Sequence, residues 1–213
     1  MAGESAPTVP SSRRQHWEAI YRAKAEDELS WHQDEPALSL QLVREVASPG
    51  SRILDVGGGS SRLASRLAEA GFRNVAVLDI SDAALERSRM QAPGHRDNIR
   101  WIVADVTRVD AVGPFDVWHD RAVFHFLVDP EERTKYVELA KRTVARRGHV
   151  IVATFAPEGP ETCSGLPVER YDATRLAAAF RPGFTLRKTV RELHTTPWGT
   201  RQPFLYAVLV RTA

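Results

Sequence analysis

The sequence predicts one α/β domain built on a doubly wound, mainly parallel sheet. Its 213 residues suit a single hydrophobic core, and a composition of 43% hydrophobic and 26% charged residues is typical of globular proteins. After residue 48, short apolar runs alternate with stretches of helical periodicity. This alternation is typical of strand–helix–strand units, whose right-handed crossovers cover both faces of a sheet.

The chain is expected to have three parts. Residues 1–12 are small, polar and proline-containing, so they are expected to form a disordered tail. Residues 13–48 carry helical patterns with three large aromatic side chains, interrupted near Pro36, and are interpreted as an N-terminal helical cap. Residues 49–213 form the predicted sheet-containing core.

The core elements follow in order. Strands are predicted over residues 52–56, 74–79, 99–104, 115–119 and 149–155. Helices are predicted over residues 60–70, over 81–90 with Ser81 as N-cap, and from Pro130 to a stop at Gly148.

The last part of the chain loses this alternation. A loop over residues 157–167 leads to a short helix over 173–180, capped by Asp172. Two final strands, 185–190 and 205–210, have no helical pattern between them. We therefore expect them to pair antiparallel, as a hairpin with a long loop over residues 191–203.

Charge and cysteine content restrict the partners and the compartment. The net charge is +2, too small to favour nucleic acid as a partner. Cys163 is the single cysteine, which suits a reducing compartment. Because no apolar segment is long enough to span a membrane and the first residues do not resemble a signal peptide, a soluble, cytoplasmic protein is expected.

A glycine-rich turn follows the first predicted strand, in the segment Asp55-Val-Gly57-Gly58-Gly59. Glycines at the carboxyl end of a parallel strand allow a ligand to approach the backbone closely. A dinucleotide site would instead require Gly-x-Gly-x-x-Gly, whose last position is Arg62 here. The acid before the glycines would repel a pyrophosphate, but it could attract an ammonium group or order the loop.

Two further acids, Asp79 and Asp105, stand at the ends of the second and third predicted strands. Because these strands are parallel neighbours, all three acids are expected along one edge of the sheet. Asp79 could accept hydrogen bonds from both hydroxyls of a ribose, and Asp105 from an adenine amine. Each acid alone is more often a helix cap or a loop residue, whereas three in register favour a nucleoside-type site.

These segments, together with Val77-Leu-Asp79-Ile-Ser81, Ala104-Asp105-Val106 and Phe115-Asp-Val-Trp-His-Asp120, resemble the class I, seven-stranded S-adenosylmethionine-dependent methyltransferases. The resemblance covers residues 13–211. It implies a Rossmann-like sheet with an antiparallel last strand, S-adenosylmethionine as cofactor and S-adenosylhomocysteine as product. It also implies that Gly57 and Gly59 approach the methionine part, Asp79 holds the ribose, and Asp105 with Val106 frames the adenine. The candidate cofactor-binding residues are Trp17, Tyr21, Trp31, Asp55, Gly57, Gly58, Gly59, Asp79, Ile80, Asp105, Val106 and His119.

The methyl acceptor is left open between two subfamilies. His16-Trp17-x-x-x-Tyr21 and the segment from Asp120 to Phe124 are similar to the elongation factor lysine methyltransferases. The same regions, with Trp31-His32-Gln33, also look like thiopurine and thiol methyltransferases, although Ala122 replaces the glycine of both motifs. A small thiol or other small metabolite is the favoured acceptor, a protein lysine is the alternative, and a non-catalytic cofactor-binding protein is a third possibility.

Three residues after the fourth predicted strand are candidates for catalysis. His125 could take a proton from the acceptor, Asp120 could do so or orient it, and Arg121 could hold an anionic substrate. The alternative makes His125 a buried helix residue and pairs Arg121 with a nearby carboxylate. Trp17, Tyr21 and Trp31 either close over the cofactor or pack only as a cap. No carboxylate set for a catalytic metal is recognisable.

Overall fold

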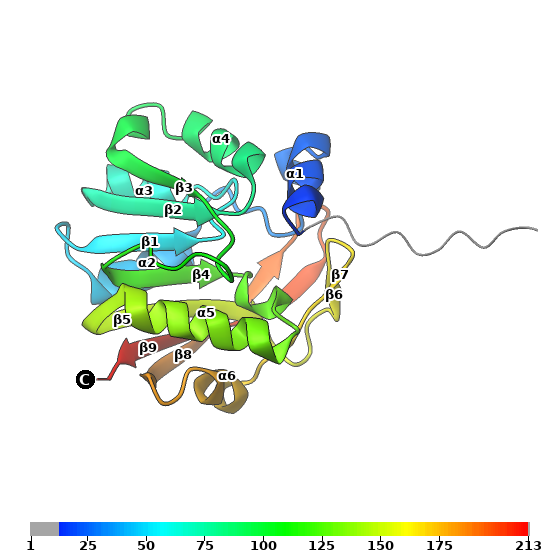
Figure 1. Cartoon of the computed structure of the whole chain (residues 1–213). Helices are drawn as coiled ribbons and strands as arrows, with labels where there is room; N and C mark the ends of the chain where they lie inside the picture. The colour runs from blue at the N-terminus through cyan, green and yellow to red at the C-terminus, as the bar shows by residue number, and fades with distance from the viewer. Residues whose placement is uncertain (1–12, 213) are drawn as a thin grey trace, which may run out of the picture.

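A computed structural model describes residues 13–212; the tail expected at residues 1–12 lies outside the described residues. Its main sheet has seven strands in the order β3-β2-β1-β4-β5-β9-β8 (Figure 1). The first five are parallel, and β9 runs antiparallel between β5 and β8. The strands are β1 (Arg52–Val56), β2 (Asn74–Asp79), β3 (Ile99–Val103), β4 (Phe115–Arg121), β5 (Val144–Phe155), β8 (Phe184–Thr195) and β9 (Arg201–Arg211). The predicted fold class is confirmed.

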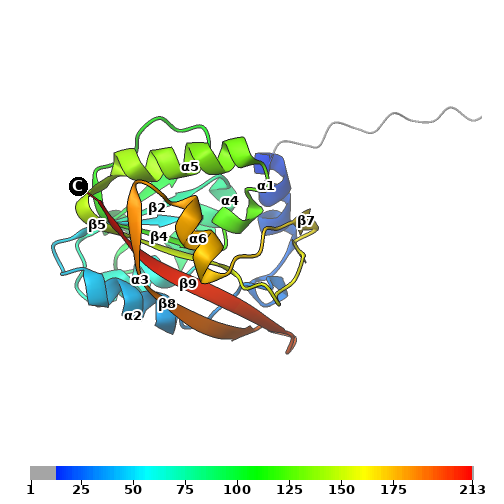
Figure 2. The same cartoon turned by 90° about the horizontal axis from the view of Figure 1, so that it is seen from below.

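Helices cover both faces of the sheet (Figure 2). One face packs against α5 (Pro130–Thr143) and α6 (Ala173–Ala179), and the other against α2 (Ala37–Val46), α3 (Leu63–Glu69) and α4 (Asp82–Met90). Along β5, Val150 and Val152 belong to the first apolar cluster, whereas Ile151 and Ala153 belong to the second. The strands read as continuous apolar runs because successive side chains alternate between two buried faces.

The expected N-terminal cap divides into two kinds of structure. α2 is a layer of the core, with Leu42 and Val43 fully buried against the sheet. α1 (Arg13–Ala23), followed by the short turn η1 (Glu26–Glu28), lies beyond the carboxyl ends of the parallel strands (Figure 1). Glu18 on α1 accepts a hydrogen bond from the backbone N–H of Asp82 at 2.7 Å, which ties α1 to the start of α4. Of the expected cap, α1 and the segment after it therefore cover the strand ends, whereas α2 does not.

The predicted end of the fifth helix at Gly148 is wrong. α5 ends at Thr143, and β5 begins at once with Val144, which pairs with Phe115. The register then shifts before the next pair, and Arg147 takes a positive φ of 63° at the irregularity. Val144 is fully buried as a strand residue. Its apolar side chain also fits the helical period of the preceding residues, and this is why the sequence placed it in the helix.

The long loop predicted over residues 191–203 is also mostly strand. β8 continues to Thr195 and β9 begins at Arg201, so the connection is short and turns at Gly199, whose φ is +88°. β8 is the edge strand, and its outward side chains other than Leu193 are polar or charged, which hid its extent in the sequence. The preceding loop contains a small two-stranded ribbon, β6 (Thr162–Cys163) with β7 (Leu166–Pro167).

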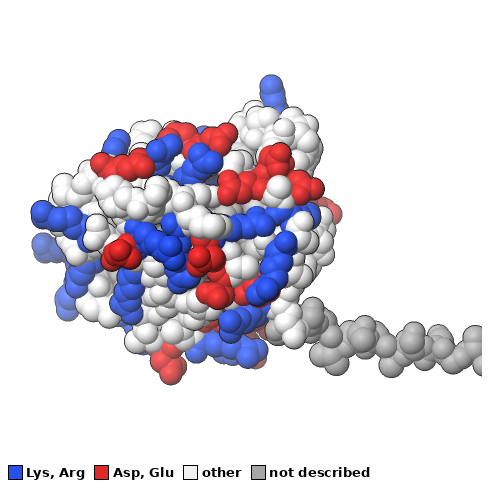
Figure 3. Space-filling view, turned by 90° about the horizontal axis from the view of Figure 1, so that it is seen from above, with Lys and Arg blue, Asp and Glu red and all other residues white. Residues whose placement is uncertain are grey.

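The surface shown in Figure 3 carries interspersed basic and acidic side chains rather than one broad area of a single sign. In the part of the chain that the structure describes, no helix is both long enough and apolar enough to cross a membrane.

Candidate active site

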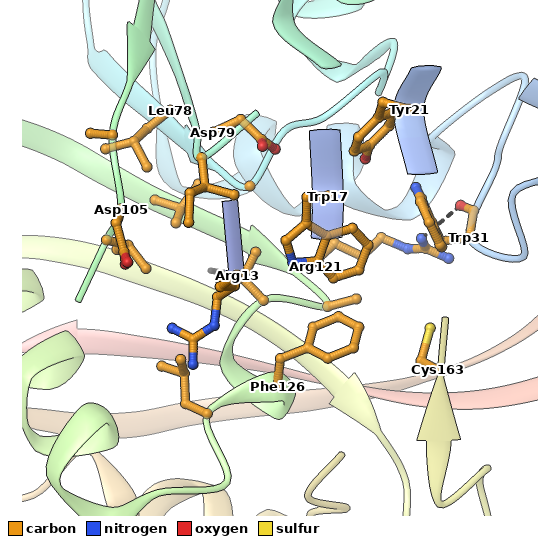
Figure 4. Close-up of a pocket in the computed structure, with 18 of the residues that line it drawn as sticks. Arg13, Trp17, Tyr21, Trp31, Leu78, Asp79, Asp105, Arg121, Phe126 and Cys163 are labelled. Carbon is orange, nitrogen blue, oxygen red and sulfur yellow. Dashed lines mark hydrogen bonds between the residues drawn. The ribbon is translucent and has the colours of Figure 1, made fainter. Parts of the chain in front are cut away.

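A pocket opens at the carboxyl ends of the parallel strands, beneath α1 (Figure 4). It holds about 830 Å³ of space, its open mouth included, which is in the range of small-molecule sites. Asp79 and Asp105 lie at one end of the pocket in this view, and Arg121, Trp31 and Cys163 at the other. We call these the acidic end and the arginine end.

The glycine turn forms part of the pocket wall with its backbone. Gly57 and Gly59 have positive φ angles of 62° and 53°, which glycine adopts without steric cost. A Cβ on Gly57 would lie 1.9 Å from Cγ2 of Val123, so no larger residue fits there without movement. The N–H of Gly57 donates to the carbonyl of Leu78 at 2.6 Å, which fixes the turn against the end of β2. The turn is therefore a rigid cradle that holds its backbone close to any bound ligand.

Asp79 links this turn to the next strand end. Its carboxylate accepts the N–H of Gly59 at 2.9 Å and that of Ser81 at 2.8 Å. The residue is only 6% exposed, and this burial raises the pKa of Asp79 to about 6. Because a carboxylate has about four acceptor positions, Asp79 keeps some capacity to bind a hydroxyl group in the pocket.

Asp105 and its neighbours form the rest of the acidic end. Oδ1 of Asp105 accepts the backbone N–H and the hydroxyl of Thr107, at 2.9 and 2.7 Å, so the loop after β3 is held in a turn. Ile80 and Val106 line the pocket beside these acids and supply apolar surface. This combination of a carboxylate and flat apolar walls suits a purine ring with an exocyclic amine.

Asp55 and His119 are brought together beneath the glycine turn. They are paired residues of β1 and β4, and Nδ1 of His119 lies 2.7 Å from Oδ1 of Asp55. The other ring nitrogen lies 2.9 Å from Oγ of Ser39 on α2. Both residues are buried; with Gly58 they border a smaller neighbouring cavity, not the main pocket. His119 thus supports the turn from a cavity that adjoins the main pocket at Gly57, and its contact with a cofactor stays a prediction.

Aromatic rings cover the mouth. Trp17 lies edge-on to Trp31 and to Phe126, with ring centroids 5.8 and 5.0 Å apart. The hydroxyl of Tyr21 sits against the glycine turn, since a Cβ on Gly59 would come within 2.2 Å of it. Burial raises the pKa of Tyr21, so its hydroxyl is neutral. These rings both pack as a cap and line the pocket, so the two alternatives from the sequence coexist in one arrangement.

Asp120 lies in the core and does not line the pocket, so its surroundings do not favour the expected catalytic role. Its carboxylate accepts the backbone N–H groups of Val123 and Phe124 at 2.8 and 3.0 Å, together with the hydroxyl of Tyr136. Burial raises the pKa of Asp120 to about 6. The residue organises the turn η3 (Phe124–Phe126) that follows β4.

His125 is likewise buried, which agrees with the alternative that made it a buried residue rather than a general base. Its ring is fully buried between Phe126 and Phe155, with centroid distances of 4.5 and 4.8 Å, and it does not line the pocket. Burial lowers the pKa of His125 to about 3. A general base must reach the proton that it removes, and the side chains of Phe126 and Phe155 lie between this imidazole and the pocket.

Arg121 does line the pocket, and it is joined there by residues that sequence analysis did not single out as site residues. Gln202 and Phe204 of β9, with Phe126 and Phe155, complete the arginine end. The last predicted strand begins only at residue 205. Had it begun at Arg201, the alternation of its side chains would have placed Gln202 on the same face as Phe204. Among residues 13–212, no group of three or more His, Cys, Asp or Glu side chains could hold a metal ion.

Comparison with known proteins agrees with this geometry. Residues 53–148 match the family model described as a methyltransferase domain. A curated relative, the eEF1A lysine and N-terminal methyltransferase of Danio rerio, is 25% identical over 141 residues, which are 66% of this chain and 20% of that protein. The Xenopus laevis protein of the same name is 24% identical over 88% of this chain and 24% of its own length. The chain therefore spans about a fifth to a quarter of the length of these relatives.

Solved structures resemble the fold over almost the whole chain. The N-methyltransferase NodS from Bradyrhizobium japonicum, in complex with S-adenosylhomocysteine, has a TM-score of 0.70 at 19% identity and covers 94% of this chain and 98% of its own. The 1,6-didemethyltoxoflavin-N1-methyltransferase from Burkholderia thailandensis, with its substrate and S-adenosylhomocysteine bound, has a TM-score of 0.74 at 16% identity, covering 99% and 94%. The match over residues 53–148, the sheet order and the glycine cradle with Asp79 make this chain similar, in sequence and in fold, to methyltransferase domains.

Proposed function

We propose that this chain is an S-adenosylmethionine-dependent methyltransferase and that its methyl acceptor is a small molecule, which enters the arginine end of the pocket. The observation that carries the proposal is the closure of that end by the segment Ser30–Gln33. The carbonyl of Trp31 accepts from Arg121 at 3.0 Å, the carbonyl of Ser30 lies 2.7 Å from Nε2 of His194, and Gln33 donates to Glu192 at 3.0 Å. These hydrogen bonds fasten the segment to β4 and β8, so a compact acceptor suits the remaining space better than a polypeptide.

The acidic end is the proposed cofactor half. The backbone of Gly57 would face the methionine part, the free acceptor positions of Asp79 would bind the ribose hydroxyls, and Asp105 with Val106 would frame the adenine. The fit is supported by the cradle at Gly57, which a Cβ would fill, and by the remaining acceptor capacity of Asp79. His119 would act indirectly, through Asp55, by holding the turn in place.

When bound, S-adenosylmethionine supplies a methyl group on a sulfonium sulfur: the methyl carbon bonds to the acceptor atom, the carbon–sulfur electron pair stays on sulfur as S-adenosylhomocysteine, and the acceptor proton leaves to solvent. The chain's own contribution is to position the acceptor and exclude water. No histidine borders the pocket within residues 13–212. The site therefore suits an acceptor, such as a thiol, that loses its proton without a strong general base.

A protein lysine is the second candidate, supported by the names of the curated relatives. A lysine ammonium entering the arginine end would approach the guanidinium of Arg121. Glu192, the nearest carboxylate there, is already engaged by Gln33, by the hydroxyl of Tyr206 and, at 3.6 Å, by Arg121 itself. This electrostatic setting disfavours a cationic side chain, so we rank the small-molecule acceptor first.

The test is to incubate cell lysate with methyl-labelled S-adenosylmethionine and the purified protein, and to follow the label by mass spectrometry. We expect it in the small-molecule fraction, with no label transferred by an Asp79→Ala variant. Label found only on polypeptide would reject the small-molecule proposal in favour of lysine. Tight binding of the cofactor without product in either fraction would indicate a non-catalytic binding protein.

A further inference from the structure

We propose that the arginine end binds a flat, uncharged or anionic ring whose edge carries a hydrogen-bond acceptor beside an N–H or O–H donor. Arg121 would donate to the acceptor atom, and Gln202 would accept from the donor. This inference rests on the proposed function, because it assigns the chemical class of the methyl acceptor in the same pocket. It is carried by two buried polar atoms that make no hydrogen bond within the described residues, and by the aromatic surface around them.

The guanidinium of Arg121 is held in one orientation with one nitrogen to spare. Nη1 donates to the carbonyl of Trp31 at 3.0 Å, and Nε donates to the hydroxyl of Tyr206 at 3.1 Å. Its central carbon lies 4.5 Å above the ring of Phe204. Nη2 is buried and makes no hydrogen bond to any residue from 13 to 212, although it lies 3.6 Å from a carboxylate oxygen of Glu192. Nη2 therefore has an ion-pair contact but no hydrogen bond, and Arg121, which lines the pocket, keeps the capacity to donate to an acceptor atom there.

Gln202 supplies the complementary atom. The residue is 7% exposed and lines the pocket, and its Oε1 is buried without a hydrogen-bond partner in the described part of the chain. Buried polar atoms in folded proteins almost always have a partner. A ligand group that donates to Oε1 would satisfy this amide.

The two unpartnered atoms belong to one face of the sheet. Gln202, Phe204 and Tyr206 are alternate residues of β9, so their side chains project from the same face. Tyr206 bonds Arg121 and Phe204 lies under its guanidinium, so Gln202 is the next side chain along that face, roughly 7 Å from Phe204 by strand geometry. Arg121 and Gln202 therefore border the same part of the pocket, where one flat molecule can contact both side chains.

The surroundings select the ring and its charge. Aromatic side chains line this end, and the rings of Phe155 and Phe204 are 4.8 Å apart. Such surfaces favour flat ligands, which gain contact area and stacking. Glu192 balances the charge of Arg121, and within the described residues no unengaged carboxylate borders this end to receive a cation. A cationic ring is therefore excluded by the proposal.

The test measures binding by calorimetry, with and without S-adenosylhomocysteine, for four bicyclic probes. Quinolin-2-one carries an acceptor beside a donor, quinoline an acceptor only, indole a donor only, and 1-methylquinolinium a positive charge. We expect quinolin-2-one to bind about tenfold more tightly than quinoline or indole, because it makes one additional hydrogen bond. We expect 1-methylquinolinium not to bind.

Variants assign this preference to residues. Gln202→Leu should weaken quinolin-2-one about tenfold while leaving quinoline and S-adenosylhomocysteine unchanged, and Gln202→Glu, which keeps an acceptor, should retain part of the affinity. Gln41→Leu, on the exposed side of α2, is the matched control. Thermal unfolding of each variant checks that it is folded.

The outcomes separate the two proposals. If S-adenosylhomocysteine does not bind the wild type, the proposed function fails. The titrations of the bicyclic probes without S-adenosylhomocysteine still test whether Arg121 and Gln202 bind a ring. If it binds, the inference is overturned when quinolin-2-one binds no better than quinoline, when none of the probes binds, when the cation binds equally well, or when Gln202→Leu changes nothing.

Discussion

Replacement of Asp79 by Asn tests the proposed cofactor half in detail. The carboxylate accepts hydrogen bonds from Gly59 and Ser81 at 2.9 and 2.8 Å and has acceptor positions left for a ligand. Asn keeps the size of the side chain but loses the charge, and its amide nitrogen cannot accept. Hydrogen bonds to charged groups contribute about 1.5–3 kcal/mol, so we expect S-adenosylhomocysteine to bind about 10- to 150-fold more weakly.

The raised pKa of Asp79 adds a pH dependence to this prediction. Only the ionised carboxylate accepts hydrogen bonds from two hydroxyl groups at once. With a pKa of about 6, full affinity is present above that pH and is lost as the pH falls through it. At pH 5 about a tenth of the carboxylates are ionised, so the wild type should bind about tenfold more weakly than at pH 7.5. The Asn variant should lose this difference.

The assay is calorimetric titration with S-adenosylhomocysteine at both pH values for wild type, Asp79→Asn and the exposed control Asp97→Asn. Comparing proteins at the same pH cancels any titration of the ligand itself. The reasoning is refuted if Asp79→Asn binds as tightly as the wild type at pH 7.5, or if both proteins respond identically to pH.

Three further predictions concern the residues around the site. Asp120→Ala removes the acceptor of two backbone N–H groups and the Tyr136 hydroxyl, so it should lower the free energy of unfolding by about 3–5 kcal/mol in urea titrations, and a loss under 1 kcal/mol would contradict the burial. The ring resonances of His125 should show no titration between pH 5 and 8 by NMR, because its pKa is about 3; a midpoint near 6.5 would show an accessible imidazole. Gly57→Ala should destabilise the protein more than Gly165→Ala, since both have positive φ but only the Gly57 site is occupied by a neighbouring side chain; equal unfolding midpoints would refute the close packing of the turn.

Much of the fold follows from local patterns. β2 spans the predicted residues 74–79, and Ser81 caps α4 through the N–H of Ala84, as its position before an amphipathic stretch indicates. Pro130 begins α5, and Asp172 caps α6 through Arg175. These signals suffice because caps and buried strands are specified by a few neighbouring residues.

Tertiary contacts decided the parts that the sequence did not reveal. Val144 fits a helical pattern, but pairing with Phe115 makes it the first residue of β5. Leu193 is 55% exposed on the edge strand β8, whose pairing with β9 holds a largely polar segment extended. Neither pairing can be inferred from a hydrophobic period alone.

The candidate site shows the same division. The strand-end acids were predictable because parallel strands share one carboxyl edge. The direction of the side chains after β4 could not be predicted, because the short turn η3 points Phe126 into the pocket and His125 into the core. Gln202 was missed since it is far from every motif in the chain and reaches the pocket only through the order of β5, β9 and β8.

The central claim is that the glycine turn and Asp79 form a site for S-adenosylmethionine rather than for a dinucleotide. Calorimetric titration of the wild-type protein with S-adenosylmethionine, S-adenosylhomocysteine and NAD tests it most directly. The account predicts micromolar binding of the first two and none of NAD. Binding of NAD alone would show that the glycine turn and Asp79 form a dinucleotide site, and the proposed function would be rejected with it.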